Sequence, residues 1–480
     1  MIYNKKTIFS SFIWRISERF FAQLISLLIS TILARLLSPS DNGQVVLLIA
    51  FINIADVFVT SGLGSALIQK KDTDDLDYSS ILIFNFISSI VIYLIVFFIS
   101  PLVSRFYDSY FYKSALRVLG IKIIFASINS VELAYVSKNN LFKQYFYSSL
   151  FGSSLSGIIG IIMAYKGFGA WSLVIQNLSS IIFTTITIGI IIKWEFKLRF
   201  SWERTEKLLS FGWKLLLSSL LDTGYNQFHS LLIGKVYSPD DLAFFSRGDQ
   251  YPSVVAGNIN NAISGVLYPT MSERQNDKHI LKEITKKAIQ IESYIIWPIM
   301  IGFVVCAKPL VVFFLTEKWI GSVPFLQIFA LIYGLWPLHT ANLQAINSIG
   351  RSDLFLKIEI IKKSIGFILF LISCRFGLMA IAVTSLFSGI ISYFINSFPV
   401  SKILNYKHIE QLQDSFVSLF IALLMGAIIF PIQFLKLSTI AVLIYQIFIG
   451  MILYLFFSYI FKVPAFLFLY NTVKEFFYKD

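Results

Sequence analysis

The chain is 480 residues long, and 56% of its residues are hydrophobic whereas only 14% are charged. Soluble domains carry about 25% charged residues, so this composition excludes a water-soluble globular protein and indicates a membrane protein. The net charge of +13 does not require a nucleic-acid partner, because basic loops beside anionic lipid account for it.

Apolar runs of about 20 residues follow one another along the chain, and each is long enough to cross about 30 Å of hydrocarbon as a helix. We therefore predict an all-α polytopic membrane protein with about fourteen transmembrane helices. Lys and Arg residues concentrate in segments 193–210, 269–289 and 351–363, which predicts that both termini are cytoplasmic. The predicted spans are residues 13–36, 43–68, 80–104, 115–136, 146–165, 171–192, 211–235, 242–268, 290–315, 322–347, 355–374, 377–399, 413–434 and 438–461.

Phrases from the first span and the turn after it recur about 200 residues later. The phrases SFIWR (11–15) and LARLLSPSDNG (33–43) have the counterparts SFGWK (210–214) and IGKVYSPDDLA (233–243), and GFGAWSLVIQNL (167–178) resembles RFGLMAIAVTSL (375–386). Span one then corresponds to span seven and span six to span twelve, so the halves are parallel. We predict six-helix bundles in residues 1–200 and 201–405, followed by two helices and a cytoplasmic tail in 406–480. Parallel repeats are typical of transporters, although duplicated membrane domains also occur in proteins that transport nothing.

Polar side chains recur every three or four residues in span one, which places them on one helix face, and span seven has a matching face. A charge near the centre of a membrane helix costs about 2.5–3.5 kcal/mol, so these faces should line a wet cavity. For Arg15 and Arg19, which lie near the cytoplasmic end, the alternative is that they snorkel to lipid headgroups. The two faces contain Arg15, Arg19, Gln23, Ser26 and Ser30 in span one, and Lys214, Ser218, Asp222, Asn226, His229 and Ser230 in span seven.

Deeper polar residues are candidates for coupling transport to an ion gradient. Asn53 and Asp56 in span two and Glu132 in span four are expected to face the same cavity as the polar faces. Asp56, Glu132 and Asp222 could each exchange a proton or Na⁺, because carboxylates inside membrane spans commonly do so. His229 is a fourth candidate, for which a hydrogen-bonded interior histidine is the alternative reading.

Three stretches resemble the bacterial polysaccharide exporters of the multidrug/oligosaccharidyl-lipid/polysaccharide (MOP) flippase superfamily. They begin ILARLLSPSDNGQVVLL (32–72), FFSRGDQYPSVVAGNIN (244–272) and FLQIFALIYGLWPLHTA (325–363). The likeness covers most of the first twelve spans and points to the branch that includes colanic-acid and teichuronic-acid exporters, beside the O-antigen flippases. It implies a V-shaped pair of helical bundles in the bacterial cytoplasmic membrane. It also implies flipping of an undecaprenyl-diphosphate-linked oligosaccharide to the outer leaflet by alternating access.

The residues of the polar faces suit such a substrate. Arg15, Arg19 and Lys214 could bind its diphosphate, since guanidinium groups contact phosphate in a bidentate manner. Amide side chains could bind sugar hydroxyls. The expected partners are the lipid-linked oligosaccharide and membrane lipids, with a polysaccharide polymerase and glycosyltransferases as further possibilities. The amide candidates are Gln23, Asn53, Asn226, Asn342, Gln344 and Asn347.

The chain is not expected to be an enzyme or to hold a cofactor. It has no Gly-rich phosphate loop ending in Lys-Ser or Lys-Thr, so it should not hydrolyse ATP itself. Its four histidines and two cysteines, Cys306 and Cys374, are scattered, which argues against a metal site. A proton, Na⁺ or the membrane potential could drive transport, and the residues do not choose among them.

Three other functions remain as alternatives. A lipid II flippase would also have fourteen spans, whereas a multidrug–cation antiporter usually has twelve and a more acidic cavity. A membrane polysaccharide polymerase or glycosyltransferase is less favoured, because such enzymes display large outer loops and the outer turns here, such as SPSDNG, are short.

Overall fold

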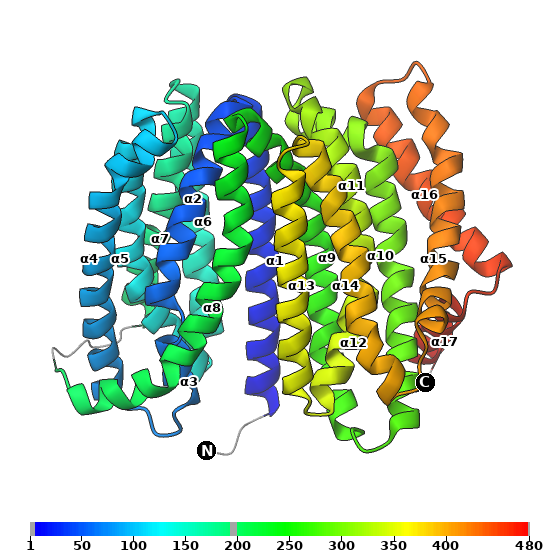
Figure 1. Cartoon of the computed structure of the whole chain (residues 1–480), viewed down its shortest axis with the longest axis horizontal. Coiled ribbons are helices and arrows are strands. Elements are labelled where there is room, and N and C mark those ends of the chain that lie inside the picture. The colour runs from blue at the N-terminus through cyan, green and yellow to red at the C-terminus, as the bar shows by residue number, and fades with distance from the viewer. Residues whose placement is uncertain (1–4, 193–198, 479–480) are drawn as a thin grey trace. The chain divides into compact units, whose positions relative to one another are not determined.

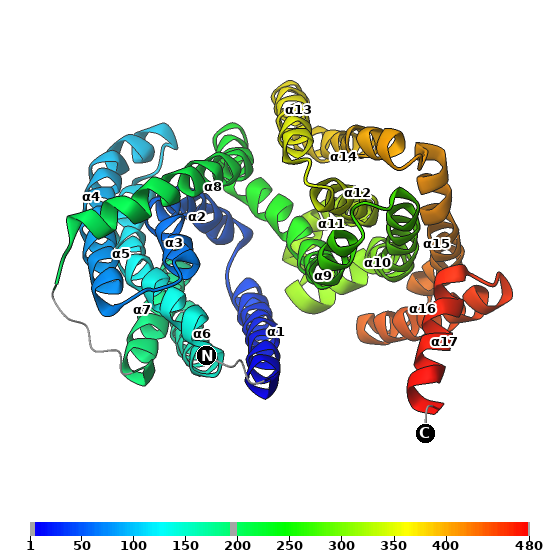
Figure 2. The same cartoon turned by 90° about the horizontal axis from the view of Figure 1, so that it is seen from below.

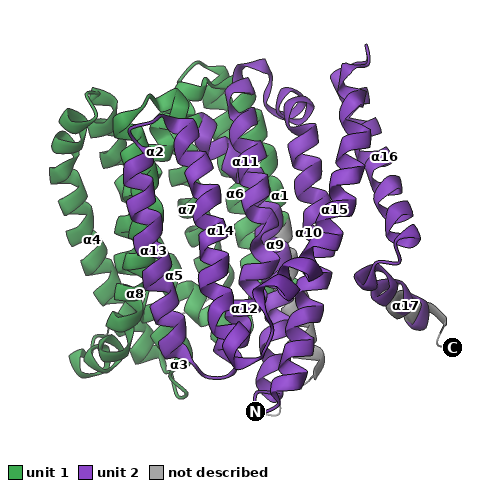
Figure 3. Ribbon diagram, turned by 45° about the vertical axis from the view of Figure 1, so that its right-hand side comes forward, with its two compact units in different colours: residues 1–243 green, residues 244–480 purple. Residues whose placement is uncertain are grey.

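The computed structural model describes the backbone of residues 5–192 and 199–478, and its side chains for Trp14 and residues 21–192, 199–471 and 474–475. All regular elements of this described part are helices (Figure 1). The helices form two compact units, Met1–Ala243 and Phe244–Asp480, which Figure 3 distinguishes by colour.

Unit 1 is a bundle in which helices that follow one another in sequence pack in pairs (Figure 2). The pairs are α4 with α5 and α6 with α7, while α1 packs on α6 and α8 packs on α2. A core of Leu67, Tyr78, Ile81 and Val131 joins α3, α4 and α5. The helices are α1 (Lys5–Leu36), α2 (Pro39–Thr60), α3 (Leu63–Gln69), α4 (Asp75–Phe106), α5 (Tyr110–Asn139), α6 (Phe142–Tyr165), α7 (Ala170–Ile192) and α8 (Trp202–Val236).

Unit 2 is built around α10 (Lys278–Leu315), which packs against α11, α12, α15 and α16. Trp297 and Ile301 of α10 are buried against Met425 of α15 and Tyr454 of α16. The remaining elements are α9 (Pro239–Glu273), whose first residues belong to unit 1, and η1 (Glu317–Ser322), α11 (Val323–Gly334), α12 (Trp336–Ser348), α13 (Ser352–Ser373), α14 (Leu378–Ile403), α15 (His408–Ile429), η2 (Phe430–Phe434), α16 (Thr439–Ile460) and α17 (Pro464–Tyr478).

Ten helical segments of the described chain are long and apolar enough to cross a membrane. All ten coincide with predicted spans, and the predicted spans on α1, α8, α9 and α13 are not among them. The part of α1 whose side chains are described, Phe21–Leu36, is apolar but shorter than a full span. Polar side chains lower the hydropathy of the other three, for example Asp222 on α8, Arg247 on α9 and Lys362 on α13. The prediction of an all-helical, multi-pass membrane protein is confirmed, and a total of fourteen crossings stays a prediction.

The helices depart from the predicted spans in three places. The span at 43–68 is divided between α2 and α3 at Gly62, whose φ of +94° is a conformation that favours glycine. The span at 322–347 is divided between α11 and α12 near Gly334, where a Cβ atom would lie 2.3 Å from the ring of Trp297. The tail beyond residue 463 contains α17, a helix that the sequence analysis did not predict.

The repeated phrases SPSD and SPDD are two equivalent helix starts. Before α2, the Ser38 hydroxyl accepts a hydrogen bond from the Asp41 amide at 3.1 Å, and the Asp41 carboxylate accepts one from the Ser38 amide at 3.1 Å. At the start of α9, Ser238 and Asp241 form the same pair of bonds at 3.1 and 3.2 Å. This reciprocal arrangement is a capping box, which satisfies amides that the helix leaves unpaired. The sequence echo therefore corresponds to a repeated local structure.

Glycines bring α8 and the residues after it close to α2 and α3. A Cβ atom on Gly43 of α2 would lie 1.7 Å from the carbonyl oxygen of Pro239, which follows α8. A Cβ atom on Gly62 would lie 2.4 Å from the carbonyl oxygen of Gly212, near the other end of α8. Because both neighbours are backbone atoms, only glycine allows this approach.

Ion pairs fasten the start of α8 to the start of α4. The Arg204 guanidinium lies 2.5 Å from the Asp74 carboxylate and 3.4 Å from that of Asp77, which Lys70 also contacts at 2.6 Å. Burial acts to raise the pKa of Asp74, but hydrogen bonds from Arg204 and from the backbone of Asp77 outweigh it and lower this pKa. The α8 helix is therefore held to unit 1 at both of its ends.

The packing boundary does not coincide with the boundary of the sequence repeat. The compact units divide after Ala243, whereas the repeat makes α8 the first helix of the second half. The two boundaries describe different properties, namely the contacts of the folded chain and the correspondence between its halves. The division into residues 1–200, 201–405 and 406–480 stays a prediction.

Candidate functional site

The α8 helix presents a row of polar side chains. Lys214, Ser218, Asp222 and Asn226 are all exposed, and each follows the previous one by four residues, about one helical turn. Elsewhere on the helix, Gly212 is buried against α3. The structure therefore brings three of the predicted site residues, namely Lys214, Asp222 and Asn226, onto one exposed row, which we call the α8 polar row.

The α1 helix continues the predicted polar face in its described part. Gln23 and Ser26 are exposed and Ser30 is half-buried. Arg15 and Arg19 are residues of the α1 helix, but the structure describes only their backbone and not their side chains. Their assignment to the cavity thus continues to depend on helical spacing alone.

Asp56 of α2 is paired with a lysine that the sequence analysis missed. The ammonium nitrogen of Lys122, on α5, lies 3.0 Å from an Asp56 carboxylate oxygen, and both side chains are mostly buried, with 23% and 14% exposed. Lys122 could have been found as a cation well inside the predicted span 115–136, opposite in sign to the lone anion in span two. Asn53, one turn before Asp56, is half-buried.

Glu132 and His229 occupy separate places in unit 1. The Glu132 side chain is only 5% exposed and lies beside α7, where a Cβ atom on Gly189 would be 3.1 Å from one carboxylate oxygen. Its other oxygen has no hydrogen-bond partner among the described residues. His229 is half-buried, and its Nδ1 lies 3.1 Å from the carbonyl oxygen of Tyr225. The four candidate coupling residues therefore do not form one cluster in the described structure.

Two predicted amides meet at a polar pocket in unit 2. Gln344 and Asn347 of α12 face Ser264 and Tyr268 of α9 across a pocket of about 700 Å³. Its lining offers amide and hydroxyl groups together with one exposed aromatic ring, and these groups can bind sugar hydroxyls and sugar rings.

Asn342 lies apart from this pocket. Its side chain is fully buried, and its amide nitrogen donates hydrogen bonds to the Leu338 carbonyl at 2.7 Å and to the side chain of Gln411 at 2.8 Å. Gln411 in turn donates to the carbonyl oxygen of Tyr406. The described contacts of Asn342 therefore join α12 to α15.

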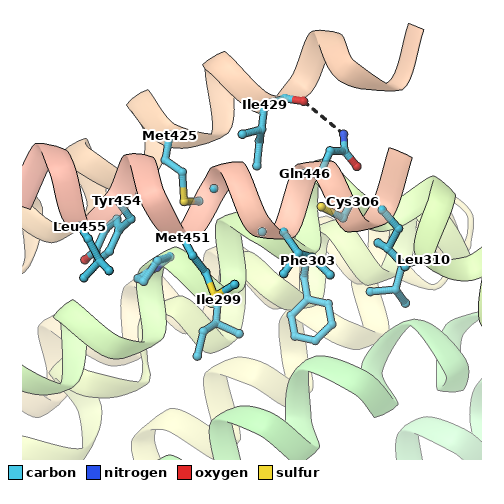
Figure 4. Close-up of a pocket in the computed structure, with 15 residues that line it drawn as sticks. Ile299, Phe303, Cys306, Leu310, Met425, Ile429, Gln446, Met451, Tyr454 and Leu455 are labelled. Atoms are coloured by element: carbon cyan, nitrogen blue, oxygen red, sulfur yellow. Dashed lines mark hydrogen bonds between the residues drawn. The ribbon is translucent and has the colours of Figure 1, made fainter. Parts of the chain in front are cut away.

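Figure 4 shows an apolar pocket of about 530 Å³ between α10, α15 and α16. Ile299, Phe303 and Met451 are among its lining residues, and Gln446 contributes an amide that donates to the Ile429 carbonyl at 3.3 Å. Such a lining suits a hydrocarbon chain better than a charged headgroup. This pocket could not be predicted from the sequence, because its residues have the composition of any apolar span.

Metal-binding groups do not gather in the described part of the chain. No three His, Cys, Asp or Glu side chains lie there in a group that could hold a metal ion. Cys306 is buried and Cys374 half-buried, and the two are not joined in a disulfide bond.

Comparison with known proteins identifies related sequences. The model of a family described as "Polysaccharide biosynthesis protein" matches residues 32–324, more than half of the chain. The succinoglycan biosynthesis transport protein ExoT of Rhizobium meliloti is 21% identical over 69% of this chain and 67% of its own length. The teichuronic acid biosynthesis protein TuaB of Bacillus subtilis is 22% identical over 62% of each chain. The lipopolysaccharide biosynthesis protein WzxC of Escherichia coli is 20% identical over 63% of this chain and 62% of its own length.

Solved structures of MOP-superfamily transporters share the fold. A structure of the lipid II flippase MurJ in an inward closed conformation aligns with a TM-score of 0.74 and 18% identity, covering 94% of this chain and 98% of MurJ. An inward-facing multidrug resistance MATE family transporter of the MOP superfamily aligns with a TM-score of 0.61 and 15% identity, covering 82% of this chain and 99% of its own. At these identities the likeness concerns the fold alone.

Proposed function

This chain belongs to the polysaccharide biosynthesis protein family of the MOP superfamily, and from that premise we propose that it flips lipid-linked oligosaccharide repeat units. It is a polysaccharide biosynthesis transport protein rather than an enzyme. The proposed substrate is an undecaprenyl-diphosphate-linked oligosaccharide, which moves from the cytoplasmic to the outer leaflet by alternating access. We also propose that the protein lies in a bacterial inner membrane with both termini in the cytoplasm. A polymerase and glycosyltransferases are proposed to act before or after this transport step.

The α8 polar row is the structural observation that supports this function. Insertion scales put the cost of a charge near the centre of a membrane helix at about 2.5–3.5 kcal/mol. Lys214 and Asp222 are both exposed on unit 1, so we propose that the row lines a water-filled path. The exposed Gln23 and Ser26 of α1 extend the same path.

Phosphate recognition is the part of this function that needs positive charge. Lys214 supplies an ammonium group, and we propose that Arg15 and Arg19 supply guanidinium groups for the diphosphate. None of the described residues that line the pocket of Gln344 and Asn347 is charged, which favours sugar hydroxyls there.

Coupling to an ion gradient is proposed for the buried carboxylates. One carboxylate oxygen of Glu132 and one of Asp56 lack a hydrogen-bond partner within the described structure. Glu132 is the favoured candidate, because it is only 5% exposed and no cation acts on it among the described residues. Asp56 already has Lys122 as its counter-ion. Asp222 and His229, both on α8, remain proposed candidates.

Lys214→Gln is expected to slow translocation at least tenfold with unchanged membrane insertion. The reason is that a hydrogen bond to a charged group contributes about 1.5–3 kcal/mol, and 1.4 kcal/mol corresponds to a factor of ten. The measurement is the flipping of a fluorescent undecaprenyl-diphosphate-linked oligosaccharide by the protein in proteoliposomes.

The matched control is Lys207→Gln at the start of the same helix. Lys207 is 73% exposed and paired with Glu203 one turn away, so its charge should be dispensable. Equal translocation rates for Lys214→Gln, Lys207→Gln and the unmodified protein would show that the α8 polar row does not line the transport path.

A lipid II flippase and a multidrug–cation antiporter are the rival functions. Proteoliposome assays with the lipid-linked oligosaccharide, lipid II and an organic cation, each offered separately, distinguish the three. Flipping of lipid II alone, or export of the cation alone, would reject the proposed substrate.

A further inference from the structure

A second apolar pocket, of about 720 Å³, lies in unit 1 where α4 and α8 both end. The hydroxyl of Tyr107, at the end of α4, donates a hydrogen bond to the Leu231 carbonyl of α8 at 3.0 Å and joins the two walls. The lining residues are Phe51, Leu102, Val103, Arg105, Phe106, Tyr107, Phe228, Leu231, Leu232 and Lys235.

The pocket runs along the helices from this end. Gly43, near the start of α2, lies against Pro239, just after α8, so α2 begins at the end where α8 finishes. The lining on α8 runs from Phe228 to Lys235, about 10 Å along the helix axis, and the ring of Phe51 lies 6.0 Å from that of Tyr107. The apolar wall is therefore long enough to accompany the first part of an acyl chain.

Two cations stand at the rim of the pocket. Arg105 lies in the last turn of α4 and Lys235 in the last turn of α8, and both line the pocket. The Lys235 ammonium donates to the Phe106 carbonyl and lies 3.4 Å from the carboxylate of Asp108. These contacts with described residues use two of its three N–H donors. Asp108 is 84% exposed, so this ion pair contributes little.

The preference for basic residues at helix C-termini explains the two cations but does not explain the pocket. Basic residues are favoured at helix C-termini because they interact well with the helix dipole. That effect does not explain why the two cations line an apolar pocket, or why Leu102 and Phe106, which also line it, are exposed. Apolar walls under a positive rim match the two parts of an anionic lipid.

We propose that this pocket binds an anionic phospholipid of the surrounding bilayer. Its phosphate lies between Arg105 and Lys235, and one acyl chain lies along Phe228, Leu231 and Phe51. On the predicted topology, both helix ends face the outer leaflet, so the lipid comes from that leaflet. The site is separate from the α8 polar row and does not depend on the proposed transport function.

Lipid retention by the purified full-length protein tests the proposal. Detergent-solubilised protein is titrated with phosphatidylglycerol or with phosphatidylcholine, and the bound lipid is counted by native mass spectrometry. The unmodified protein should retain one phosphatidylglycerol more tightly than any phosphatidylcholine. Arg105→Gln/Lys235→Gln should weaken this retention about thirtyfold, because each basic residue near anionic lipid contributes about fivefold.

The control is Lys166→Gln/Arg375→Gln, which removes two other exposed basic residues on the same predicted face. It should leave the retention unchanged. Equal retention by the Arg105→Gln/Lys235→Gln variant and the unmodified protein would overturn the proposal. An equal rise in melting temperature on adding soluble glycerol phosphate and on adding phosphatidylglycerol would also overturn it, since that outcome would indicate a phosphate site without a lipid chain.

A second variant keeps the test valid if the double variant does not fold. Leu232→Trp fills the apolar wall while both cations stay in place. It should also release the phosphatidylglycerol, because the acyl chain loses its space. Retention that survives Leu232→Trp would show that only the headgroup is bound and would reject the pocket as its site.

Discussion

Gly43→Ala is expected to lower the stability of the folded protein by about 3 kcal/mol, the upper part of the usual range for an overpacked site. The added methyl group would lie 1.7 Å from the Pro239 carbonyl oxygen and 2.5 Å from its carbonyl carbon. Because these are backbone atoms, no side-chain rotation can relieve the contact, and the starts of α2 and α9 would have to separate. Thermal unfolding of the detergent-solubilised variant measures the effect.

Gly224→Ala is the matched control for this prediction. Gly224 also lies in a helix of unit 1, but a Cβ atom there would have nothing within 4 Å in the described structure. Alanine is the better helix former by roughly 0.5–1 kcal/mol, so this variant should be at least as stable as the unmodified protein. A Gly43→Ala variant that unfolds at the same temperature as Gly224→Ala would contradict the close approach.

The repeated helix starts show how far the sequence leads. The phrases SPSD and SPDD predict equivalent local structures, because a serine followed three residues later by an acidic residue forms a capping box. The structure contains both. The requirement for glycine could not be predicted in this way. Position 43 aligns with Ala243 in the repeat, and only the contact with Pro239 distinguishes the two positions.

Long apolar segments were predictable, whereas the contacts of polar groups were not. Every predicted span lies on one helix or on two consecutive helical segments, to within a few residues, because length and hydropathy depend on the local sequence alone. The partner that a polar side chain finds depends on which helices become neighbours in the fold. Asn342 and Gln344 are two residues apart on α12, yet Asn342 is buried against α15 while Gln344 lines a pocket with α9. Helical spacing could place them on different faces but could not identify those partners.

The candidate site shows the same difference between what local spacing predicts and what depends on tertiary contacts. The spacing of Lys214, Asp222 and Asn226 predicts one row, and the structure has that row exposed. A single polar residue in a span carries no such pattern. Asp56 was therefore predicted as a coupling residue without its neighbour on α5, Lys122, whose ammonium lies 3.0 Å away.

Removing either member of this buried pair is expected to destabilise unit 1 strongly. Asp56→Asn and Lys122→Met should each lower the free energy of unfolding by about 3 kcal/mol, because each leaves the other charge buried without its partner. The double variant should lose clearly less than the sum of the two, since it leaves no uncompensated charge. Thermal unfolding of the four proteins gives the coupling energy directly.

The exposed pair Glu203–Lys207 provides the matched cycle. Its side chains are 77% and 73% exposed, and such helix-surface pairs contribute about 0.3–0.5 kcal/mol. A coupling energy for Asp56–Lys122 as small as that of the surface pair would contradict the buried ion pair. Measuring translocation in the same variants then separates two roles for Asp56. If the double variant regains stability and still flips substrate, Asp56 is a structural partner of Lys122. If stability returns while translocation stays lost, its carboxylate takes part in transport.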